Sequence, residues 1–315
     1  MKGELAVKRG RAAARPSLWK NIKKNRVNYV MLLPFAVLFT LFTIIPVVSA
    51  IVLSFTDFDM VQMPVFTGFS NYIRMFLNDD VFPVCFKNTM VFAFITGPIS
   101  FFACFFFAWL INELNPTLRT LMTFIFYAPS ISGSLYVIFS WVFSGDMYGL
   151  INSVLMELSI INEPVQWLTD ARYILGVCMV VQIWLSLGAG FLSFIAGLQG
   201  IDRQIYEAGA IDGIKSRLQE LIYLTLPHMG PQLFFAAVMQ IGASFSVAGV
   251  AIAIAGNPST DNAGATIVTH IIDMGNMRYE MGYASAISFF LFAIMLFANF
   301  ILRNILKAVT KEDMA

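Results

Sequence analysis

Six long apolar runs constrain this chain more than any other feature of its sequence. They cover about residues 29–55, 89–112, 119–143, 172–198, 231–255 and 281–302. A helix rises 1.5 Å per residue, so roughly 20 apolar residues cross the ~30 Å hydrocarbon layer of a bilayer. The composition agrees, because 58% of the 315 residues are hydrophobic and only 12% are charged. We therefore expect an all-α membrane protein with six transmembrane helices.

The basic residues are distributed unevenly along the chain. Nine of the 20 Lys and Arg residues precede the first run: Lys2, Lys8, Arg9, Arg11, Arg15, Lys20, Lys23, Lys24 and Arg26. Positively charged segments stay on the cytoplasmic side, so we expect both termini in the cytoplasm. The expected organisation is a basic tail over 1–27, a six-span domain over 28–305 and a C-terminal tail over 306–315. Binding of the basic tail to nucleic acid is the alternative interpretation.

Glycine and proline interrupt three of the runs, at Gly97-Pro98, within Ala128–Ser134 and within Ser186–Gly190. Membrane helices tolerate such breaks where neighbouring helices or a cavity satisfy the backbone. Close packing of helices through small residues explains any one of them. Several breaks together favour a pathway through the membrane.

Charged side chains are absent from the middle of every apolar run, whereas ion-coupled carriers usually keep such groups there. Neutral polar and aromatic side chains occupy the fourth and fifth runs instead. A neutral polyhydroxylated solute needs hydrogen-bond partners and flat apolar faces. We therefore predict a substrate pathway that includes Gln182, Trp184, Ser186, Gln240, Ser244, Phe245 and Ser246. Hydrogen bonding between packed helices is the alternative role for each.

The segment between the fourth and fifth runs is rich in charge and begins at Ile201 as "IDRQIYEAGAIDGIKSRLQELIYLTLPHMGPQ". Its spacing predicts a short helix over 203–211, a turn with positive φ at Gly213, and a second helix over 215–224 that ends before Pro227. Helices of this kind dock into a groove on a partner protein. We therefore expect residues 201–230 to form a docking loop on the cytoplasmic face.

The same loop resembles the EAA loop of ABC-importer permeases, by which these subunits dock onto their ATPases. The matching residues are Glu207, Ala208, Gly209, Asp212, Gly213, Leu226 and Pro227. The resemblance to carbohydrate-uptake permeases related to the maltose transporter extends to "GFSNYIRMFLNDDVFPVCFKNT", "GLQGIDRQIYEAG" and "GYASAISFFLF", and it covers the chain from about residue 28. Two features depart from the family pattern: Gly209 replaces Ala, and the interval from Gly213 to Pro227 is one residue longer.

The resemblance implies a type I ABC importer permease with a cytoplasmic coupling helix, in the bacterial cytoplasmic membrane. Glu207 would face a basic residue of the ATPase, Gly213 would make the turn, and Pro227 would start the return to the membrane. The implied substrate is a sugar or oligosaccharide delivered by an extracytoplasmic solute-binding protein. The implied partners are a second, homologous permease and two ATPase subunits, which would bind ATP and Mg. This chain would bind no cofactor.

Other functions are less consistent with the sequence. The chain contains no "GxxxxGK[ST]", so it has no phosphate-binding loop of that kind, and we expect a non-catalytic subunit. A gradient-driven carrier would need an internal repeat and coupling groups at the midplane. A membrane enzyme would need clustered His, Asp, Glu or Cys, whereas His228 and His270 lie in separate regions and the three cysteines have no metal spacing. A polyol or glycerol phosphate stays open as the substrate.

Overall fold

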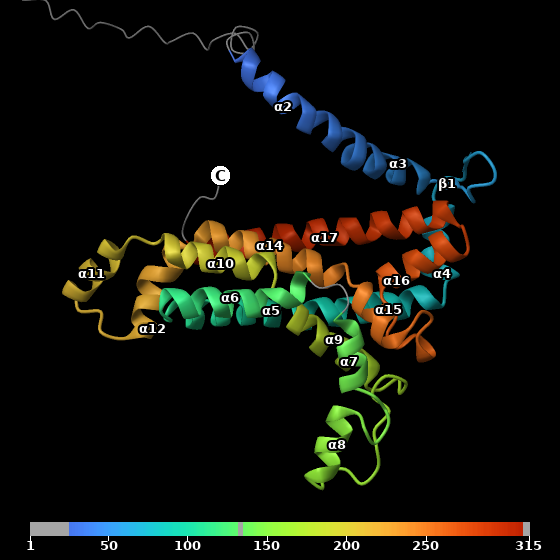
Figure 1. Cartoon of the computed structure of the whole chain (residues 1–315). Helices are drawn as coiled ribbons and strands as arrows, with labels where there is room; N and C mark the ends of the chain where they lie inside the picture. Colours follow the sequence, from blue (N-terminus) through green and yellow to red (C-terminus); the bar gives the residue numbers. More distant parts are fainter. Residues whose placement is uncertain (1–24, 132–134, 311–315) are drawn as a thin grey trace, which may run out of the picture. The chain divides into compact units, whose positions relative to one another are not determined.

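The structure, a computed structural model, describes residues 25–131 and 135–310 (Figure 1). Most of the two expected tails, 1–27 and 306–315, and the end of the Ala128–Ser134 break lie outside these residues. Packing divides the chain into two units, residues 1–49 and residues 50–315. Each unit is described by itself below.

The first unit contains the first apolar helix. It is formed by α2 (Arg26–Phe39), a π turn η1 (Thr40–Ile44) and the start of α3 (Ile45–Leu53). The π turn ends two residues before Pro46, whose ring does not fit against the carbonyl group four residues earlier in a regular helix. None of the α2 side chains is buried within the chain, as expected for a helix that faces lipid or another membrane subunit.

The second unit is almost entirely helical. Its only strands among the described residues are β1 (Thr56–Asp57) and β2 (Val65–Phe66), which pair antiparallel with Thr56 opposite Phe66. Its α-helices are α4 (Ser70–Leu77), α5 (Val81–Asn112), α6 (Pro116–Ile131), α7 (Tyr136–Val142), α8 (Leu150–Glu157), α9 (Ile174–Leu185), α10 (Ala189–Gly200), α11 (Arg203–Ile211), α12 (Arg217–Glu220), α13 (Leu226–His228), α14 (Gly230–Phe245), α15 (Gly249–Ala255), α16 (Ile267–Ile272) and α17 (Met281–Thr310). Short π or 3₁₀ turns are η2 (Leu221–Thr225), η3 (Thr260–Asn262) and η4 (Asp273–Met277).

Within the described residues, five helical segments are long and apolar enough to cross a membrane. They are Arg26–Leu53, Val81–Asn112, Ile174–Gly200, Gly230–Ala255 and Met281–Ile305. A sixth is formed if the bent pair α6 and α7 is one span. The fold class is therefore the expected one, an all-α protein with five or six candidate membrane spans.

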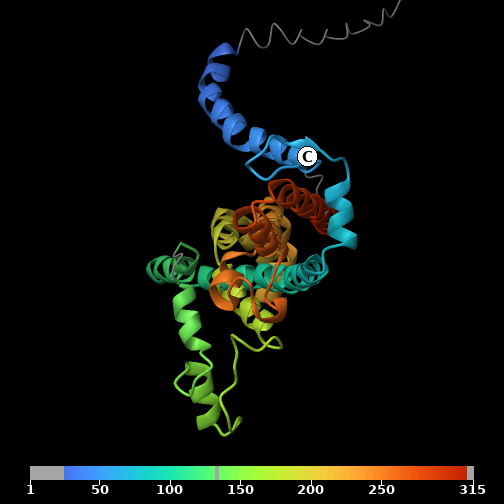
Figure 2. The same ribbon diagram turned by 90° about the vertical axis from the view of Figure 1, so that its right-hand side faces the viewer.

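Helices α5, α10 and α14 pack against one another at the centre of the second unit. Figure 2 shows the teal α5, the yellow-green α10 and the orange α14 side by side. Small residues permit close contact, since a β-carbon on Gly190 would lie 3.5 Å from that of Ala236. Phe191 and Phe194 fill the space beside these contacts and are fully buried. This three-helix core holds the polar segment 201–230 at one end (Figure 1).

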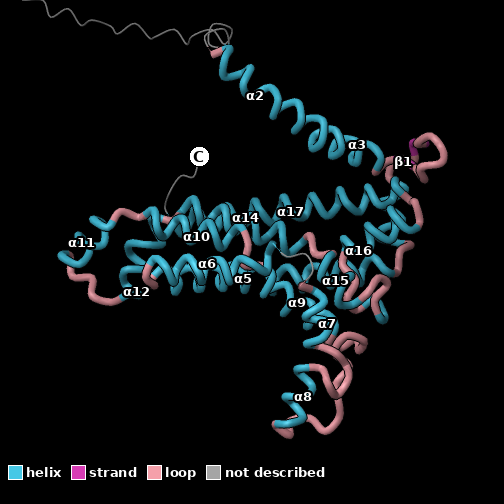
Figure 3. Tube along the Cα trace, viewed as in Figure 1, coloured by secondary structure: helices cyan, strands magenta, loops and turns pink. Residues whose placement is uncertain are grey.

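The expected breaks in the spans differ from one another. Helix α5 continues through Gly97 and Pro98 without interruption, whereas the fourth span is broken between Leu185 and Ala189, where α9 ends and α10 begins (Figure 3). Gly188 lies in this break, which frees backbone carbonyl groups in the middle of the span. Within the break, the carbonyl group of Ser186 accepts the backbone N–H of Gly188 at 2.7 Å, and neighbouring helices can supply further donors.

Candidate functional site

Helix α11 forms the first half of the polar segment and has the bounds expected from the sequence, Arg203–Ile211. Asp202 precedes it, and its carboxylate accepts a hydrogen bond of 3.0 Å from the backbone N–H of Gln204. This side chain satisfies one of the N–H groups that a helix leaves free at its start. Glu207, Ala208 and Ile211 are exposed, whereas Gly209 is buried.

The turn after α11 is a Schellman motif centred on Gly213. The φ angle of Gly213 is +94°, a conformation that glycine adopts without steric cost. Two hydrogen bonds close the motif, from Ile214 N–H to Gly209 O at 2.9 Å and from Gly213 N–H to Ala210 O at 3.3 Å. The predicted positive φ at Gly213 is confirmed.

The second helix of the segment differs from the expected one at both ends. It begins at Arg217, because Ser216 and Gln219 form a capping box, and it does not end before Pro227. The chain stays helical through the π turn Leu221–Thr225 and through α13 to His228. Pro227 fits because the π turn Leu221–Thr225 ends two residues before it, so the regular α-helical hydrogen-bond pattern is already interrupted there. The predicted bounds 215–224 were therefore wrong.

Side chains join the two helices of the segment. The hydroxyl groups of Tyr206 in α11 and Thr225 in η2 lie 3.0 Å apart, and Thr225 Oγ1 also donates to Glu220 O at 3.3 Å. Thr225 is buried. These contacts hold α11 and the return helix, residues 217–228, together. Of the other residues that resemble the EAA loop, Leu226 is half-buried, whereas Asp212, Gly213 and Pro227 are exposed.

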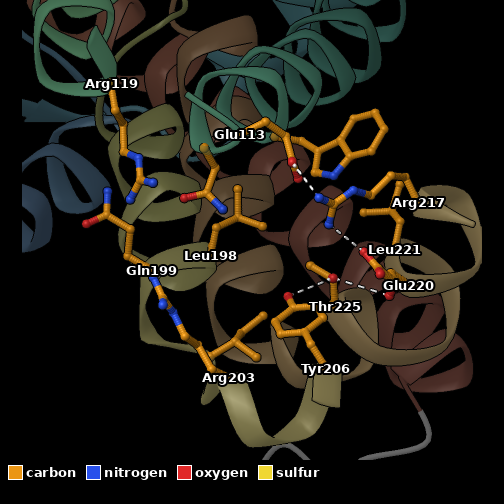
Figure 4. Close-up of a pocket in the computed structure, with 13 residues that line it drawn as sticks. Glu113, Arg119, Leu198, Gln199, Arg203, Tyr206, Arg217, Glu220, Leu221 and Thr225 are labelled. Carbon is orange, nitrogen blue, oxygen red and sulfur yellow. Dashed lines mark hydrogen bonds and ion pairs between the residues drawn. The ribbon is translucent and has the colours of Figure 1, made fainter. Parts of the chain in front are cut away.

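A cavity of about 370 Å³ lies behind the segment, between it and the ends of α5 and α10 (Figure 4). At one side of this cavity, Arg217 bridges two carboxylates, at 3.2 Å from Glu113 and 2.8 Å from Glu220. The hydrogen bond to Glu220, with the charge of Glu113, raises the pKa of Arg217. Because Glu113 follows α5 directly, the ion pair joins the polar segment to a membrane-spanning helix.

The predicted pathway residues of the fourth and fifth spans have different environments. Trp184 is 52% exposed and Ser246 is exposed, while Gln182 and Ser186 are half-buried. Gln240, Ser244 and Phe245 are buried. None of the seven lines the cavity behind the polar segment.

Gln240 makes contacts that its position in the sequence does not suggest. Its Nε2 donates to Ser186 O and to Cys104 Sγ, both at 3.2 Å. Ser186 lies in the break of the fourth span, and its carbonyl group also accepts the backbone N–H of Gly188 at 2.7 Å, so the Gln240 amide is an additional donor to it. The thiol of Cys104 also donates to Ser186 O at 3.5 Å. The two side chains and the Ser186 carbonyl group join α5, α14 and the α9–α10 break in the core.

Sequence reasoning missed a buried polar cluster at the opposite end of the second unit. Asp79 Oδ2 accepts hydrogen bonds from Tyr283 Oη at 2.5 Å and from His270 Nε2 at 2.8 Å. Burial by itself would raise the pKa of Asp79, but these hydrogen bonds outweigh burial and hold that pKa below its ordinary value of 3.8. Nearby, Asn88 donates to the carbonyl groups of Asn262, Ala263 and Ala265 at 3.0–3.1 Å. The partners are far apart in the sequence, so no local motif marks them.

Among the described residues, no group of three or more His, Cys, Asp or Glu side chains is placed to hold a metal ion. Cys85, Cys104 and Cys178 are buried and unbridged.

Comparison with known proteins places the chain in a family. No family model matches it, but the lactose transport system permease protein LacF of Rhizobium radiobacter is 32% identical over 216 residues, 67% of this chain and 70% of that protein. The chain belongs to the ABC-transporter permease family. A second permease, the arabinooligosaccharides transport system protein AraP of Bacillus subtilis, is 26% identical over 294 residues and covers 92% of both chains. The resemblance stated from the sequence is confirmed.

Solved structures show the same permease fold. A chain of a bacterial ABC transporter involved in the import of the acidic polysaccharide alginate has a TM-score of 0.73 and 22% identity, over 93% of this chain and 99% of that chain. A chain of the alginate transporter in complex with an alginate pentasaccharide-bound periplasmic protein has the same TM-score of 0.73 and 25% identity, over 92% and 98%. The expected all-α permease architecture is therefore confirmed.

Proposed function

We propose that the chain is the membrane-spanning subunit of an ATP-driven importer for a sugar or oligosaccharide. The names of its relatives support this substrate class, since they include lactose and arabinooligosaccharide transport. The absence of charge from the middle of the apolar runs also favours a neutral substrate. An extracytoplasmic solute-binding protein delivers the sugar, in the way that the alginate transporter is seen with its periplasmic protein.

The chain works with a second permease and two ATPase subunits. The ATPases bind ATP and Mg and carry out hydrolysis, while this subunit binds no cofactor and catalyses no reaction. The distribution of basic residues supports a topology with both termini and residues 201–230 in the cytoplasm, because Arg203, Lys215 and Arg217 lie in that loop. The ATPase then meets the chain at α11.

The observation that carries the proposal is the exposed face of α11. Glu207 and Ile211 are one turn apart, and Ile211 is 88% exposed. An exposed large apolar side chain beside an exposed carboxylate suits a protein contact. Gly213 turns the chain sharply behind this face, so that α11 projects from the end of the bundle (Figure 3).

The contacts behind α11 suit the transmission of force. The Tyr206–Thr225 hydrogen bond joins α11 to the return helix, and the Arg217–Glu113 pair joins that helix to the end of α5. Closure of the ATPases would therefore move the polar segment and α5 together. The result is a rigid-body switch that exposes the substrate pathway alternately to the two sides.

The substrate pathway runs past the fourth and fifth spans. Trp184 and Ser246 are its best candidates for direct contact with sugar, because both side chains are exposed, and Gln182 lies two residues before Trp184. Ser186, Gln240, Ser244 and Phe245 lie behind them. These four keep the wall of the pathway in place.

Charge reversal on α11 tests the docking. In the complete transporter, Glu207→Lys should abolish ATP-dependent uptake and release the ATPase on purification, while the amount of inserted permease stays unchanged. Glu163→Lys is the matched control, because Glu163 is exposed in an expected outer loop, and it should retain both properties. Normal uptake with normal co-purification in Glu207→Lys would refute the proposal.

A further inference from the structure

Two cavities meet at the end of α6 and α10. The first is the cavity of about 370 Å³ behind the polar segment, and the second is a groove of about 420 Å³ along α6 and α10. Arg119 and Gln199 line both. The groove extends from them along the two helices past Thr123, Phe124, Tyr127 and Ile195. The first cavity, called the chamber below, is charged, and it continues into the mostly apolar groove between two membrane helices.

The arginines of the chamber differ in how they are neutralised. Arg217 is paired with Glu113 and Glu220. Arg119 donates from Nη2 to Leu114 O at 3.1 Å, but its buried Nε has no hydrogen-bond partner among the described residues. The side chain of Arg203 has no hydrogen bond or ion pair with any other described residue. Positive charge without a counter-charge therefore remains at Arg119 and Arg203.

Figure 4 shows how these side chains lie. Arg119 and Arg203 both extend toward Gln199 on one side of the cavity, whereas Arg217 lies on the other side between Glu113 and Glu220. The buried Nε of Arg119 is an unpaired donor closed off from water, which costs free energy, whereas Arg203 is exposed and carries a charge with no carboxylate partner among the described residues. A ligand with several acceptor oxygens and negative charge would satisfy both guanidinium groups at once.

The position of the chamber indicates which anion this is. Helix α6 begins at Pro116 and α10 ends at Gly200, both beside the chamber. In the expected topology the chamber therefore lies at the depth of the lipid headgroups. Trp109 also lines it, and tryptophan favours this interface. A basic pocket between membrane helices on the cytoplasmic side is typical of anionic-lipid recognition. A free phosphate would leave the apolar groove without a ligand.

We propose that Arg119 and Arg203 bind the phosphate of an anionic phospholipid, with one acyl chain lying in the groove between α6 and α10. Arg203 is the first residue of α11, so the lipid headgroup would hold the start of that helix against the bundle. The site is separate from the exposed Glu207 face, and it would exist whatever substrate the transporter carries.

Lipid retention tests the site. The purified transporter complex is incubated with phosphatidylglycerol or phosphatidylcholine, and bound lipid is counted by native mass spectrometry. We expect preferential retention of phosphatidylglycerol. Arg203→Gln and Arg119→Gln should each lower this retention about tenfold, the loss expected for one charge-assisted hydrogen bond. Arg203→Lys should keep part of it, and Arg172→Gln, on an expected outer loop, should change nothing.

Two further measurements separate the possible ligands. Thr123→Trp fills the groove without changing a charge, so it should lower lipid retention while inorganic phosphate fails to compete. Equal retention of the two lipids, or competition by inorganic phosphate with no effect of Thr123→Trp, would overturn the proposal. It would also be overturned if Arg203→Gln released the ATPase and left lipid retention unchanged, because the chamber would then belong to the protein interface. The Glu207→Lys result is independent of these outcomes.

Discussion

Leu224 occupies the space that a side chain at position 209 would need. A β-carbon on Gly209 would lie 2.6 Å from Cδ1 of Leu224 and 3.3 Å from Cδ1 of Ile214. Leu224 belongs to the π turn Leu221–Thr225, and such a turn holds one residue more than an α-helical turn. The π turn therefore holds Leu224 against Gly209.

Gly209→Ala should accordingly destabilise the polar segment, although alanine favours helix formation by about 1 kcal/mol. Overpacking costs about 1–3 kcal/mol, and the new methyl group would also lie 3.3 Å from Cδ1 of Ile214. Leu224→Ala in the same chain should relieve the clash, so the two changes should be non-additive in a double-mutant cycle. Thermal unfolding of the purified permease measures this. A gain in stability for Gly209→Ala alone would contradict the interpretation.

Gln240→Leu should destabilise the core by about 1 kcal/mol, since it removes one hydrogen bond to the Ser186 carbonyl group, which keeps the Gly188 N–H and the Cys104 thiol as donors. The matched variant is Ser244→Ala in the same helix, because Ser244 is also buried but donates only to Ile241 O, one turn earlier. Its effect should be smaller. Denaturant unfolding compares the two. If Gln240→Leu were as stable as the wild type yet changed sugar uptake, the side chain would contact substrate instead.

Local signals explain which parts of the polar segment the sequence could predict. Helix α11 has an acidic cap at Asp202 and a glycine turn at Gly213, and both signals lie within a few residues of the helix ends. The predicted end of the second helix was wrong, because the rule that helices stop before proline assumes regular α-helical turns. A π turn precedes Pro227 here, and the helix continues.

Contacts between distant residues explain what the sequence could not predict. Gln240 contacts a carbonyl group 54 residues away, and Asp79 contacts His270 across 191 residues. A polar residue in an apolar run indicates only that a partner is needed. Whether the partner is sugar or a broken helix depends on how the spans pack, and a single sequence does not contain that information.

The Asp79 cluster should make stability depend on pH in acid. Because the pKa of Asp79 is lowered from 3.8 in the fold, the ionised carboxylate stabilises the folded state. This contribution is fully present above the ordinary value and is lost as pH falls through the lowered pKa. Asp79→Asn should therefore be less stable than the wild type at about pH 7, and the difference should shrink below about pH 4.

Thermal unfolding across this pH range checks the prediction. Asp80→Asn is the control, because Asp80 is exposed and its side chain makes no cap hydrogen bond at the start of α5. It should leave the acid dependence as in the wild type. A stability gap for Asp79→Asn that is the same at all pH values would show that the carboxylate charge is not involved.

Trp184→Ala should impair uptake while the ATPase stays bound. The indole is 52% exposed on the fourth span, and a stacking contact worth about 1.5 kcal/mol corresponds to roughly a tenfold change in apparent substrate affinity. Trp184→Phe should keep most of the activity, because it retains an aromatic face, and Trp141→Ala controls for loss of an exposed tryptophan from another helix. Transport kinetics in proteoliposomes with the binding protein present measure the effect. Unchanged kinetics in Trp184→Ala would remove this residue from the pathway, whereas loss of the ATPase would show that the change acts on assembly.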